Sequence, residues 1–434
     1  MQRILLLSAT TGYQLRSFNE AAERLGVTLV FATDRCHHLD DPWRDRAIPV
    51  RFHEPAASLE LIAEAGREQP FAGVLAVGDR PTVLAALAAE RLGLPGHPAD
   101  AVAASGNKRA TRDRFAAAGL MTPWHLALPM DSDAAGAAHI PPDVRFPCVL
   151  KPLGLSGSRG VIRADSPPEF DAARRRIAAL LRRPDVRAAR RGAEVDDLIL
   201  VEGFVPGREV AVEGVLTNGT LQVFAIFDKP DPLDGPFFEE TIYVTPSSLD
   251  GPAQDALAAA VARGAAALGL RHGAIHAECR LADDGVFVLE IAARPIGGLC
   301  SRALRFDAVV PASDGAAATW TLEDVLLRHA LGTNVADVRR EAAASAVMMI
   351  PIPRRGVLKG VHGEGEALAV PHVEAVVITA KPDQLLEPLP EAGSYLGFIF
   401  ARAGRAGEAE SAVRQAHARL RFTIETPIDL VVKT

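Results

Sequence analysis

The run AIHAECRLADDGVFVLEIAA at residues 274–293 is predicted to form one β-hairpin. Both of its arms alternate polar and apolar residues, which is typical of strands that bury one face. The three residues 283–285 between the arms predict a three-residue loop, with glycine where a left-handed backbone is needed. In this arrangement Ala282 pairs with Val286, and the pairs further along the two strands follow from that register.

The predicted register places Glu278 directly opposite Glu290, an arrangement that costs stability. Like charges that face each other across two strands are unfavourable by roughly 0.2–1 kcal/mol. A hard divalent cation, which takes oxygen ligands, would explain why both acids are present. Strand alternation puts His276 and Arg280 on the face of Glu278, and Arg294 on the face of Glu290. The hairpin therefore predicts a cation site; the alternative is a solvent-facing hairpin with scattered charges.

Length and composition limit the class of protein. A chain of 434 residues is too long for one core, so about two to four domains are expected. With 48% hydrophobic and 23% charged residues it has the composition of a soluble globular protein. A net charge of −7 without a basic stripe argues against a nucleic-acid partner. No apolar run is long enough to cross a membrane and no signal-peptide pattern opens the chain, so no membrane partner is expected.

The four cysteines, Cys36, Cys148, Cys279 and Cys300, lie far apart and lack the spacing of metal ligands. Free thiols of this kind fit a reducing cytosol, which predicts a cytoplasmic location. Cys300 follows a pair of glycines and could border a site, but a buried bystander is the simpler interpretation.

The first hundred residues alternate short apolar strands with amphipathic helices, which predicts a parallel α/β unit. The loop after the first strand carries a single glycine, Gly12, in place of the G-x-G-x-x-G of dinucleotide folds, and this argues against a nicotinamide enzyme. From residue 144 the pattern changes to strands around a glycine-rich loop, and after about residue 325 a helix leads to a last block of short strands. The predicted fold class is α/β followed by α+β.

A glycine-rich loop, Gly154-Leu-Ser-Gly-Ser-Arg-Gly160, follows Lys151 at the end of a predicted strand. Its backbone N–H groups can surround phosphate oxygens, and the nearby lysine supplies a positive charge. The loop lacks G-x-x-x-x-G-K-[ST], and a strand rather than a helix follows, so it is not a Walker loop. Taken alone, the simpler interpretation is a hairpin loop of small residues.

The segment LILVEGFVPGRE at residues 198–209 predicts a buried strand that ends in a carboxylate and a turn. A strand edge of this kind can offer backbone donors and acceptors to a purine, with the side chains of Glu202 and Glu209 available for amino and hydroxyl groups. An ordinary strand–turn–strand is the alternative. Lys108, near the start of a predicted helix, is by itself a solvated helix residue.

The order of these motifs resembles the ATP-grasp superfamily over at least residues 1–305. The landmarks are, in sequence, Lys108, Lys151 with its glycine loop, Glu202 to Glu209, and Glu278 with Glu290-Ile-Ala-Ala-Arg294. The resemblance implies a Rossmann-like parallel α/β domain at 1–105, an ATP-grasp fold with its lid at 106–200 and its Mg/ATP site at 201–330, and a C-terminal α+β extension at 331–434.

The resemblance also implies ATP and Mg²⁺ (or Mn²⁺) as cofactors and a role for each landmark. These roles are Lys108 and Lys151 for the phosphates; Ser156, Gly157 and Ser158 for the loop that closes over them; Glu202, Gly203 and Val205 for the adenine and Glu209 for the ribose; Glu278 and Glu290 for ATP and the metal ion; and Arg294 for the transferring phosphoryl group. One departure is Ala292, where the superfamily usually has a metal-binding Asn. A water there, a weaker second metal or a loss of activity would follow.

Further motifs look like the L-amino-acid ligase (dipeptide synthetase) branch, which joins a small-molecule carboxylate to an amine through an acyl phosphate and leaves ADP. They are Asp228-Lys229, Phe237 to Thr241, and Pro295-Ile-Gly297-Gly298. In this resemblance Lys229, Glu239 and Glu240 bind substrate, while Gly297 and Gly298 let backbone approach the acyl phosphate. His276 would orient the nucleophile or act as a base, since histidine titrates near neutral pH. A histidine that merely packs beside the metal site is the alternative.

Three other functions stay open on the sequence alone. A purine-pathway ligase and a bicarbonate- or biotin-type carboxylase belong to the same superfamily, although no biotin carrier domain is visible in this chain. A non-catalytic ATP-binding module is the third, because of Ala292. A homodimer through the N-terminal domain would be usual for such enzymes.

Overall fold

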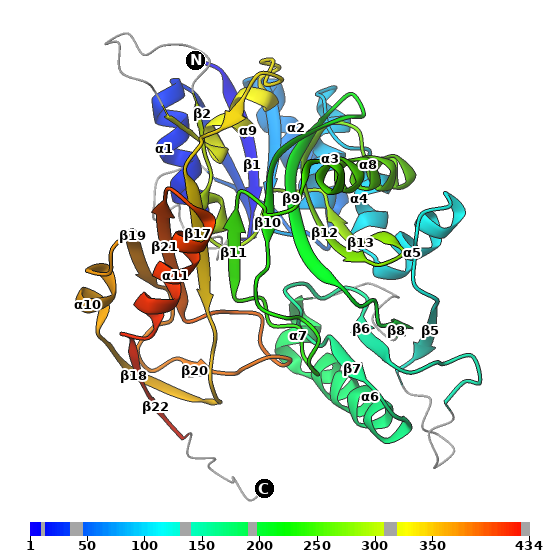
Figure 1. Cartoon of the computed structure of the whole chain (residues 1–434). Helices are drawn as coiled ribbons and strands as arrows, with labels where there is room; N and C mark the ends of the chain where they lie inside the picture. Colours follow the sequence, from blue (N-terminus) through cyan, green and yellow to red (C-terminus); the bar gives the residue numbers. More distant parts are fainter. Residues whose placement is uncertain (10–13, 35–46, 131–139, 190–197, 308–318, 427–434) are drawn as a thin grey trace, which may run out of the picture.

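The computed structural model describes residues 1–9, 14–34, 47–130, 140–189, 198–307 and 319–426; Gly12 and Cys36 lie outside these ranges. The described elements form five β-sheets with helices packed on them (Figure 1). The predicted combination of an α/β and an α+β part is confirmed. Within the described ranges, no helix combines the length and apolar character needed to cross a bilayer.

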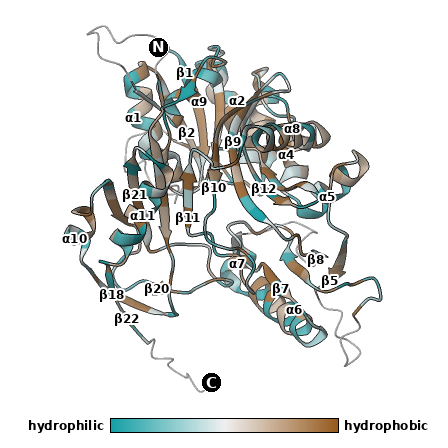
Figure 2. Cartoon of the chain, viewed as in Figure 1, coloured by the Kyte–Doolittle hydropathy of each residue, from teal (hydrophilic) through white to brown (hydrophobic). Residues whose placement is uncertain are grey.

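The N-terminal sheet is parallel, with strand order β3-β2-β1-β4, as the alternating sequence pattern predicts. In β1 (Arg3–Ser8) the side chains of residues 4–7 are fully buried, because helices cover both faces of such a sheet. Figure 2 shows its strands as hydrophobic ribbons. The other elements are α1 (Leu15–Leu25), β2 (Thr28–Thr33), β3 (Ile48–Pro49), α2 (Pro55–Glu68), β4 (Gly73–Val77), α3 (Thr82–Leu92) and α4 (Ala99–Ser105).

A second, antiparallel sheet with strand order β5-β8-β6-β7 forms the lid. One face of α6 (Pro167–Arg182) packs on this sheet through Phe170, Ile177 and Leu181. The glycine-rich loop joins two of its strands. The remaining elements are α5 (Lys108–Ala117), β5 (His125–Pro129), β6 (Cys148–Pro152), β7 (Ile162–Ala164), α7 (Pro184–Ala189) and β8 (Leu198–Gly203).

The largest sheet has eight strands in the order β13-β12-β9-β10-β11-β17-β21-β19. Its first five strands come from residues 208–292 and its last three from residues 344–403. The predicted C-terminal extension therefore continues the sheet that carries the hairpin, joined to it where β11 pairs with β17. The elements are β9 (Arg208–Thr217), β10 (Thr220–Asp228), β11 (Ile242–Thr245), α8 (Gly251–Leu268), β12 (Gly273–Ala282), β13 (Gly285–Ala292), β17 (Ala344–Ile350), β19 (Val373–Ile378), β21 (Gly397–Ala403) and α11 (Ala406–His417).

Two three-stranded sheets, β15-β14-β16 and β20-β18-β22, complete the described fold. The chain that follows β20 leaves the C-terminal part and runs toward α7 in the lid (Figure 1). The elements are η2 (Cys300–Ala303), β14 (Arg305–Asp307), β15 (Thr319–Thr321), α9 (Leu322–Ala330), β16 (Arg339–Arg340), β18 (Gly356–His362), α10 (Glu364–Leu368), β20 (Leu385–Leu386) and β22 (Arg421–Glu425).

The β12–β13 hairpin forms as predicted, with one correction to its turn. Glu278 pairs with Glu290, as expected. Ala282, however, pairs with Gly285, so the turn has two residues and the predicted three-residue loop is wrong. Leu289 is the extra residue of a β-bulge between these pairs. The bulge supplies the residue that the shorter turn lacks, and this restores the facing acids.

Tight contact between turns gives a test of this fold. Gly207, between β8 and β9, has a φ of +107°, and a Cβ there would clash with the carbonyl of Leu281 in β12. Gly219, between β9 and β10, has a φ of +88° but no atom within 4 Å of a Cβ. We expect Gly207→Ala to lower the free energy of unfolding by about 3 kcal/mol or more, and Gly219→Ala by about 1–2 kcal/mol. Urea unfolding of both variants measures the difference in the free energy of unfolding. Equal losses in the two variants would contradict the close approach of Gly207 to strand β12.

Candidate active site

A cavity of about 280 Å³ lies between the lid, the central sheet and the C-terminal strands. Most of the residues predicted from the sequence to act together line it. They are Lys108, Lys151, Ser156, Gly157, Ser158, Glu202, Gly203, Val205, Glu209, Glu240, His276, Glu278, Glu290, Arg294, Gly297 and Gly298. Lys229 and Glu239 are not among its lining residues.

The facing acids Glu278 and Glu290 carry little compensating charge. The Nζ atom of Lys108 lies 3.7 Å from a Glu290 oxygen, and that of Lys229 lies 3.8 Å from a Glu278 oxygen, both longer than a hydrogen bond. Burial, and then the neighbouring Glu240 carboxylate, raise the pKa of Glu278 to about 8. A divalent cation between the two acids would relieve this repulsion, so the donor set fits Mg²⁺.

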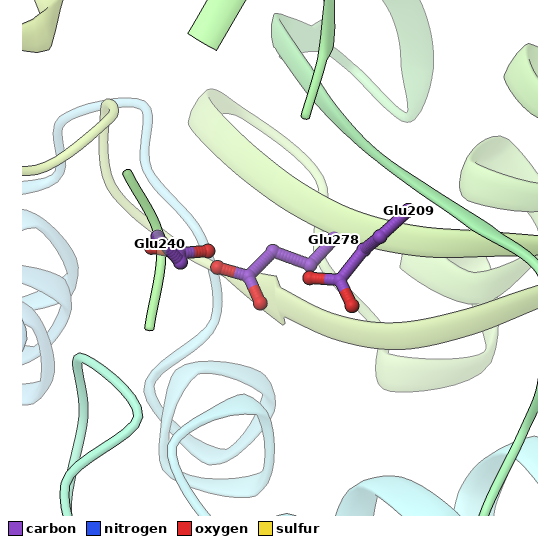
Figure 3. Close-up of side chains that lie close together, drawn as sticks. All are labelled: Glu209, Glu240 and Glu278. Atoms are coloured by element: carbon purple, nitrogen blue, oxygen red, sulfur yellow. The ribbon is translucent and has the colours of Figure 1, made fainter. Parts of the chain in front are cut away.

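Glu278 also belongs to a tighter group of three acids, with Glu209 from β9 and Glu240 (Figure 3). One oxygen from each of the three lies within 4.8 Å of the others. The ammonium of Lys229 sits among them, 2.8 Å from Glu209 and in direct contact with Glu240. Burial would lower the pKa of Lys229, but these carboxylates raise it well above its usual value.

Lys229 is therefore a built-in counter-ion whose side chain is only 3% exposed. Lys229 is predicted to bind substrate, and in the structure its ammonium donates hydrogen bonds to Glu209 and Glu240 of the wall. Glu209 is also committed, since its second oxygen accepts a hydrogen bond of 2.8 Å from Arg280 Nε. The sequence pattern placed Arg280 on the correct face but gave it no role.

Glu202 is the centre of a second buried ion-pair network. Its carboxylate binds Arg112 through bonds of 2.8 and 3.2 Å and Lys151 at 2.6 Å. Burial would raise its pKa, yet the two cations hold the pKa at about 2. The Glu202 carboxylate is thus paired with two cations, and its role at the adenine stays a prediction.

Arg112, which the sequence analysis missed, also donates a 2.8 Å hydrogen bond to the carbonyl of Leu289, the bulge residue of the hairpin. It lies one helical turn after Lys108 on α5, so its spacing could have revealed a shared face. The β-bulge has a physical use here, because it leaves a backbone carbonyl free for this arginine.

Glu213, on β9 and fully buried, organises the catalytic edge of the cavity. It lies 3.1 Å from His276 Nδ1 and accepts bonds of 3.2 and 3.1 Å from the Ile296 N–H. The Ile296 carbonyl accepts a 2.5 Å bond from Gln14. Burial raises the pKa of Glu213 and lowers that of His276. The backbone of Ile296, directly before Gly297, is therefore held at both its N–H and its carbonyl. The Glu213 carboxylate also orients the His276 ring.

Arg294 reaches the N-terminal domain. Its Nε donates a 2.5 Å hydrogen bond to Asp79, which follows the carboxyl end of β4. Burial would raise the pKa of Asp79, but Arg294 brings it below its usual value. Ligands of parallel α/β sheets gather at the carboxyl ends of the strands, so Asp79 could have been proposed from the sequence.

The glycine-rich loop closes one side of the cavity. Lys108 Nζ donates a 2.7 Å hydrogen bond to the carbonyl of Leu155 within this loop. Gly157, Ser158 and Gly160 all have positive φ angles, a conformation that turns successive backbone groups in unusual directions. The loop is thus folded over the lysine that was predicted to hold phosphates.

Aromatic residues, mainly from the second half of the chain, also line the cavity. Tyr243 on β11 donates a 2.9 Å hydrogen bond to Glu240, and Tyr395 packs edge-on against Phe398. Met349 on β17 is a further lining residue. The sequence analysis missed these residues because nothing in a block of short strands marks which of them will join the central sheet.

Three family models match the chain in sequence order. The model of the ATP-grasp N-terminal domain matches residues 19–96, that of the ATP-grasp domain matches 144–303, and that of the L-amino acid ligase C-terminal domain 2 matches 348–425. The ATP-grasp model covers the facing acids and the strands β6, β7 and β8 of the lid.

Among curated relatives, the chain is 26% identical over 288 residues to the ATP-grasp enzyme fsqD of Aspergillus fumigatus, a match that covers 62% of this chain and 46% of that one. It is 27% identical over 248 residues to a D-alanine–D-alanine ligase of Aromatoleum aromaticum, covering 56% and 74%. Of fsqD, the match thus spans less than half the length.

A crystal structure of an L-amino acid ligase from Bacillus licheniformis superimposes with a TM-score of 0.79 at 25% identity, over 98% of this chain and 99% of that one. The likeness extends through the C-terminal strands as well as the ATP-grasp core. The chain therefore belongs to the ATP-grasp superfamily of ligases and carries the C-terminal domain of its L-amino-acid ligase branch.

Proposed function

We propose that this chain activates the carboxylate of an amino acid with ATP, as an acyl phosphate, and joins it to an amine with release of ADP and phosphate. The observation that carries this proposal is the lining of the cavity. Lysines, the glycine-rich loop and the two facing acids line it together with Glu240 and the aromatic residues Phe238, Tyr243, Tyr395 and Phe398. Both reactants of such a ligation would therefore meet within one cavity.

Phosphoryl transfer needs charge neutralisation and positioning more than covalent chemistry from the protein. Glu278 and Glu290 would hold Mg²⁺, which neutralises phosphate charge when bound. Lys108 and Lys151 add positive charge beside the glycine-rich loop. Arg294, fixed by Asp79, would stabilise negative charge on the phosphoryl group as the carboxylate oxygen attacks the γ-phosphorus.

In the second half-reaction the amine nitrogen attacks the acyl carbon and phosphate leaves. Gly297 and Gly298 would let backbone approach the acyl group, because the peptide of Ile296 is already fixed. His276 has Nδ1 beside Glu213 and Nε2 3.9 Å from Glu278, so it is oriented to take the proton that the amine loses. Glu240, which lines the cavity, and Glu239 would hold a substrate ammonium.

The charges of the cavity favour an amino acid over a purine-pathway intermediate. A ribose phosphate or bicarbonate needs cationic side chains of its own. The cations that line the cavity already lie beside acids: Arg112 and Lys151 beside Glu202, Arg280 beside Glu209, Arg294 beside Asp79, and Lys108 near Glu290. The remaining lining includes the aromatic residues Phe238, Tyr243, Tyr395 and Phe398.

We also propose a cytoplasmic location, a homodimer through the N-terminal domain, and the domain limits given from the sequence. The cysteines within the described residues, Cys148, Cys279 and Cys300, are buried and free, which supports a reducing compartment. Size-exclusion chromatography with light scattering tests the dimer.

The activity itself can be measured with purified chain, Mg-ATP and pools of amino acids, by following phosphate release and the masses of new amides. We expect amide and ADP in equal amounts. Glu290→Gln should lower kcat about 100-fold or more, because several kcal/mol of charge stabilisation are lost. Glu366→Gln, on the exposed part of α10, serves as the control. ATP binding without ADP formation from any pool would contradict the proposal and favour the non-catalytic alternative that Ala292 suggests.

Metal binding should depend on pH through Glu278. Its pKa of about 8 means that the carboxyl is protonated below this pH and must lose the proton when a cation binds. Mn²⁺ affinity without nucleotide should therefore rise about tenfold from pH 6 to pH 7 and level off above pH 8. Calorimetry in two buffers of different ionisation enthalpy counts the released proton. An affinity that stays constant between pH 6 and pH 8 would show that Glu278 is already ionised or does not bind the metal.

A further inference from the structure

The segment 387–395, between β20 and β21, borders the substrate side of the cavity. Gly393, Ser394 and Tyr395 contribute to its lining. The segment is anchored in the central sheet directly after Tyr395, where the Leu396 N–H donates a 2.9 Å hydrogen bond to the carbonyl of Ile350. One end of the segment is therefore fixed to the rigid part of the site.

The other end of this segment is bound to the lid. Glu391 accepts two hydrogen bonds, of 2.5 and 2.9 Å, from the guanidinium of Arg176 on α6. Glu387 accepts a 2.7 Å bond from Arg183, which follows α6 directly. An isolated exposed ion pair contributes little, but a two-pronged Arg–carboxylate pair also fixes orientation.

Two backbone contacts carry the connection into the glycine-rich loop itself. The N–H of Gly160 donates a 2.8 Å bond to the carbonyl of Pro390, and Arg159 Nε donates a 2.7 Å bond to the carbonyl of Glu391. Arg159 and Gly160 close the loop whose residues 155–158 line the ATP side. The segment thus contacts the loop that covers one reactant while it forms the wall beside the other.

We propose that Glu391 is a positioning residue that couples the two sides of the cavity. By holding the lid through Arg176, it makes closure over ATP and completion of the wall at Ser394 and Tyr395 a single event. Nucleotide binding would then prepare the amino-acid side before any carboxylate is activated. The meaning of this coupling rests on the proposed ligase function, and its structural basis is the set of contacts that Glu387, Pro390 and Glu391 make with the lid. We call the ion pair between Glu391 and Arg176 the latch. Because coupling free energies are reciprocal, a variant that weakens the latch must also weaken nucleotide binding.

Charge exchange between the two partners tests the latch. Glu391→Arg and Arg176→Glu each place like charges in contact, and the double variant restores an opposite pair in reverse. Arg176 also lies 4.9 Å from the ring centre of Phe237, so the Glu391 variant is the cleaner single change. Glu410→Arg is the matched control, since Glu410 pairs with Arg414 at 2.9 Å on α11 with similar exposure.

The probe is the non-hydrolysable β,γ-imido analogue of ATP with Mg²⁺. Its affinity is measured by calorimetry, and amide exchange of residues 155–163 is measured by mass spectrometry with the analogue bound. We expect each single reversal to weaken the analogue about tenfold and to speed exchange in this peptide alone. The affinity of the double variant for the analogue should recover to within about threefold of that of the native chain. Glu410→Arg should have the affinity and amide exchange of the native chain.

Native-like affinity and exchange in both single variants would overturn the proposal, as would a double variant no better than the singles. These readouts require only nucleotide binding. If the chain forms no amide, the ligase proposal is contradicted but the coupling proposal can still be confirmed. If the chain is an active ligase whose lid closes without the Glu391–Arg176 pair, only the coupling proposal is contradicted.

Discussion

The structure depends on how a single cavity balances its negative charge. Five glutamates line the cavity and Glu213 contacts its His276, and burying a carboxylate is costly unless a cation or several donors compensate it. Glu202 has Arg112 and Lys151, Glu209 has Lys229 and Arg280, and Glu240 shares Lys229. Glu213 has His276 and the Ile296 N–H.

This compensation separates structural acids from the acids that are left for a ligand. Glu278 and Glu290 have their nearest lysine nitrogens at 3.8 and 3.7 Å, and the pKa of Glu278 is raised accordingly. The chain thus supplies internal cations to Glu202, Glu209 and Glu240 and hydrogen-bond donors to Glu213, and it leaves Glu278 and Glu290, which fit an external cation. Lys229 compensates Glu209 and Glu240, and Arg112 compensates Glu202, so these two cations largely decide which acids are left without a close cation.

The sequence predicted the features that depend on local pattern and order. Alternation of polar and apolar residues was enough to predict the facing pair, and alternation of strands with helices was enough to predict the parallel N-terminal sheet. Motif order was enough to predict the family. The sequence did not reveal contacts between residues far apart in the chain: Glu202 with Arg112, Lys229 with Glu209, and Asp79 with Arg294 are tertiary contacts. The hairpin turn shows the same limit, because a two-residue turn with a bulge and a three-residue turn without one place the acids identically.

The C-terminal strands add residues to the wall of the cavity that the ATP-grasp part of the chain forms. β17 pairs with β11, so the sheet that carries the acids continues without a break into the strands that carry Met349 and Phe398. A continuous sheet fixes the aromatic wall relative to Glu278 more rigidly than a linked domain could. The segment after β20 then returns to the lid, where Glu387 and Glu391 accept hydrogen bonds from Arg183 and Arg176.

The central claim is that Glu278 and Glu290 form the cation site. The most direct measurement is the anomalous scattering of Mn²⁺ in crystals grown with ADP. The account predicts a peak between these two carboxylates, with an oxygen of each at about 2.1–2.2 Å. A peak held by Glu209 and Glu240, with Lys229 displaced and Glu290 out of reach, would contradict it.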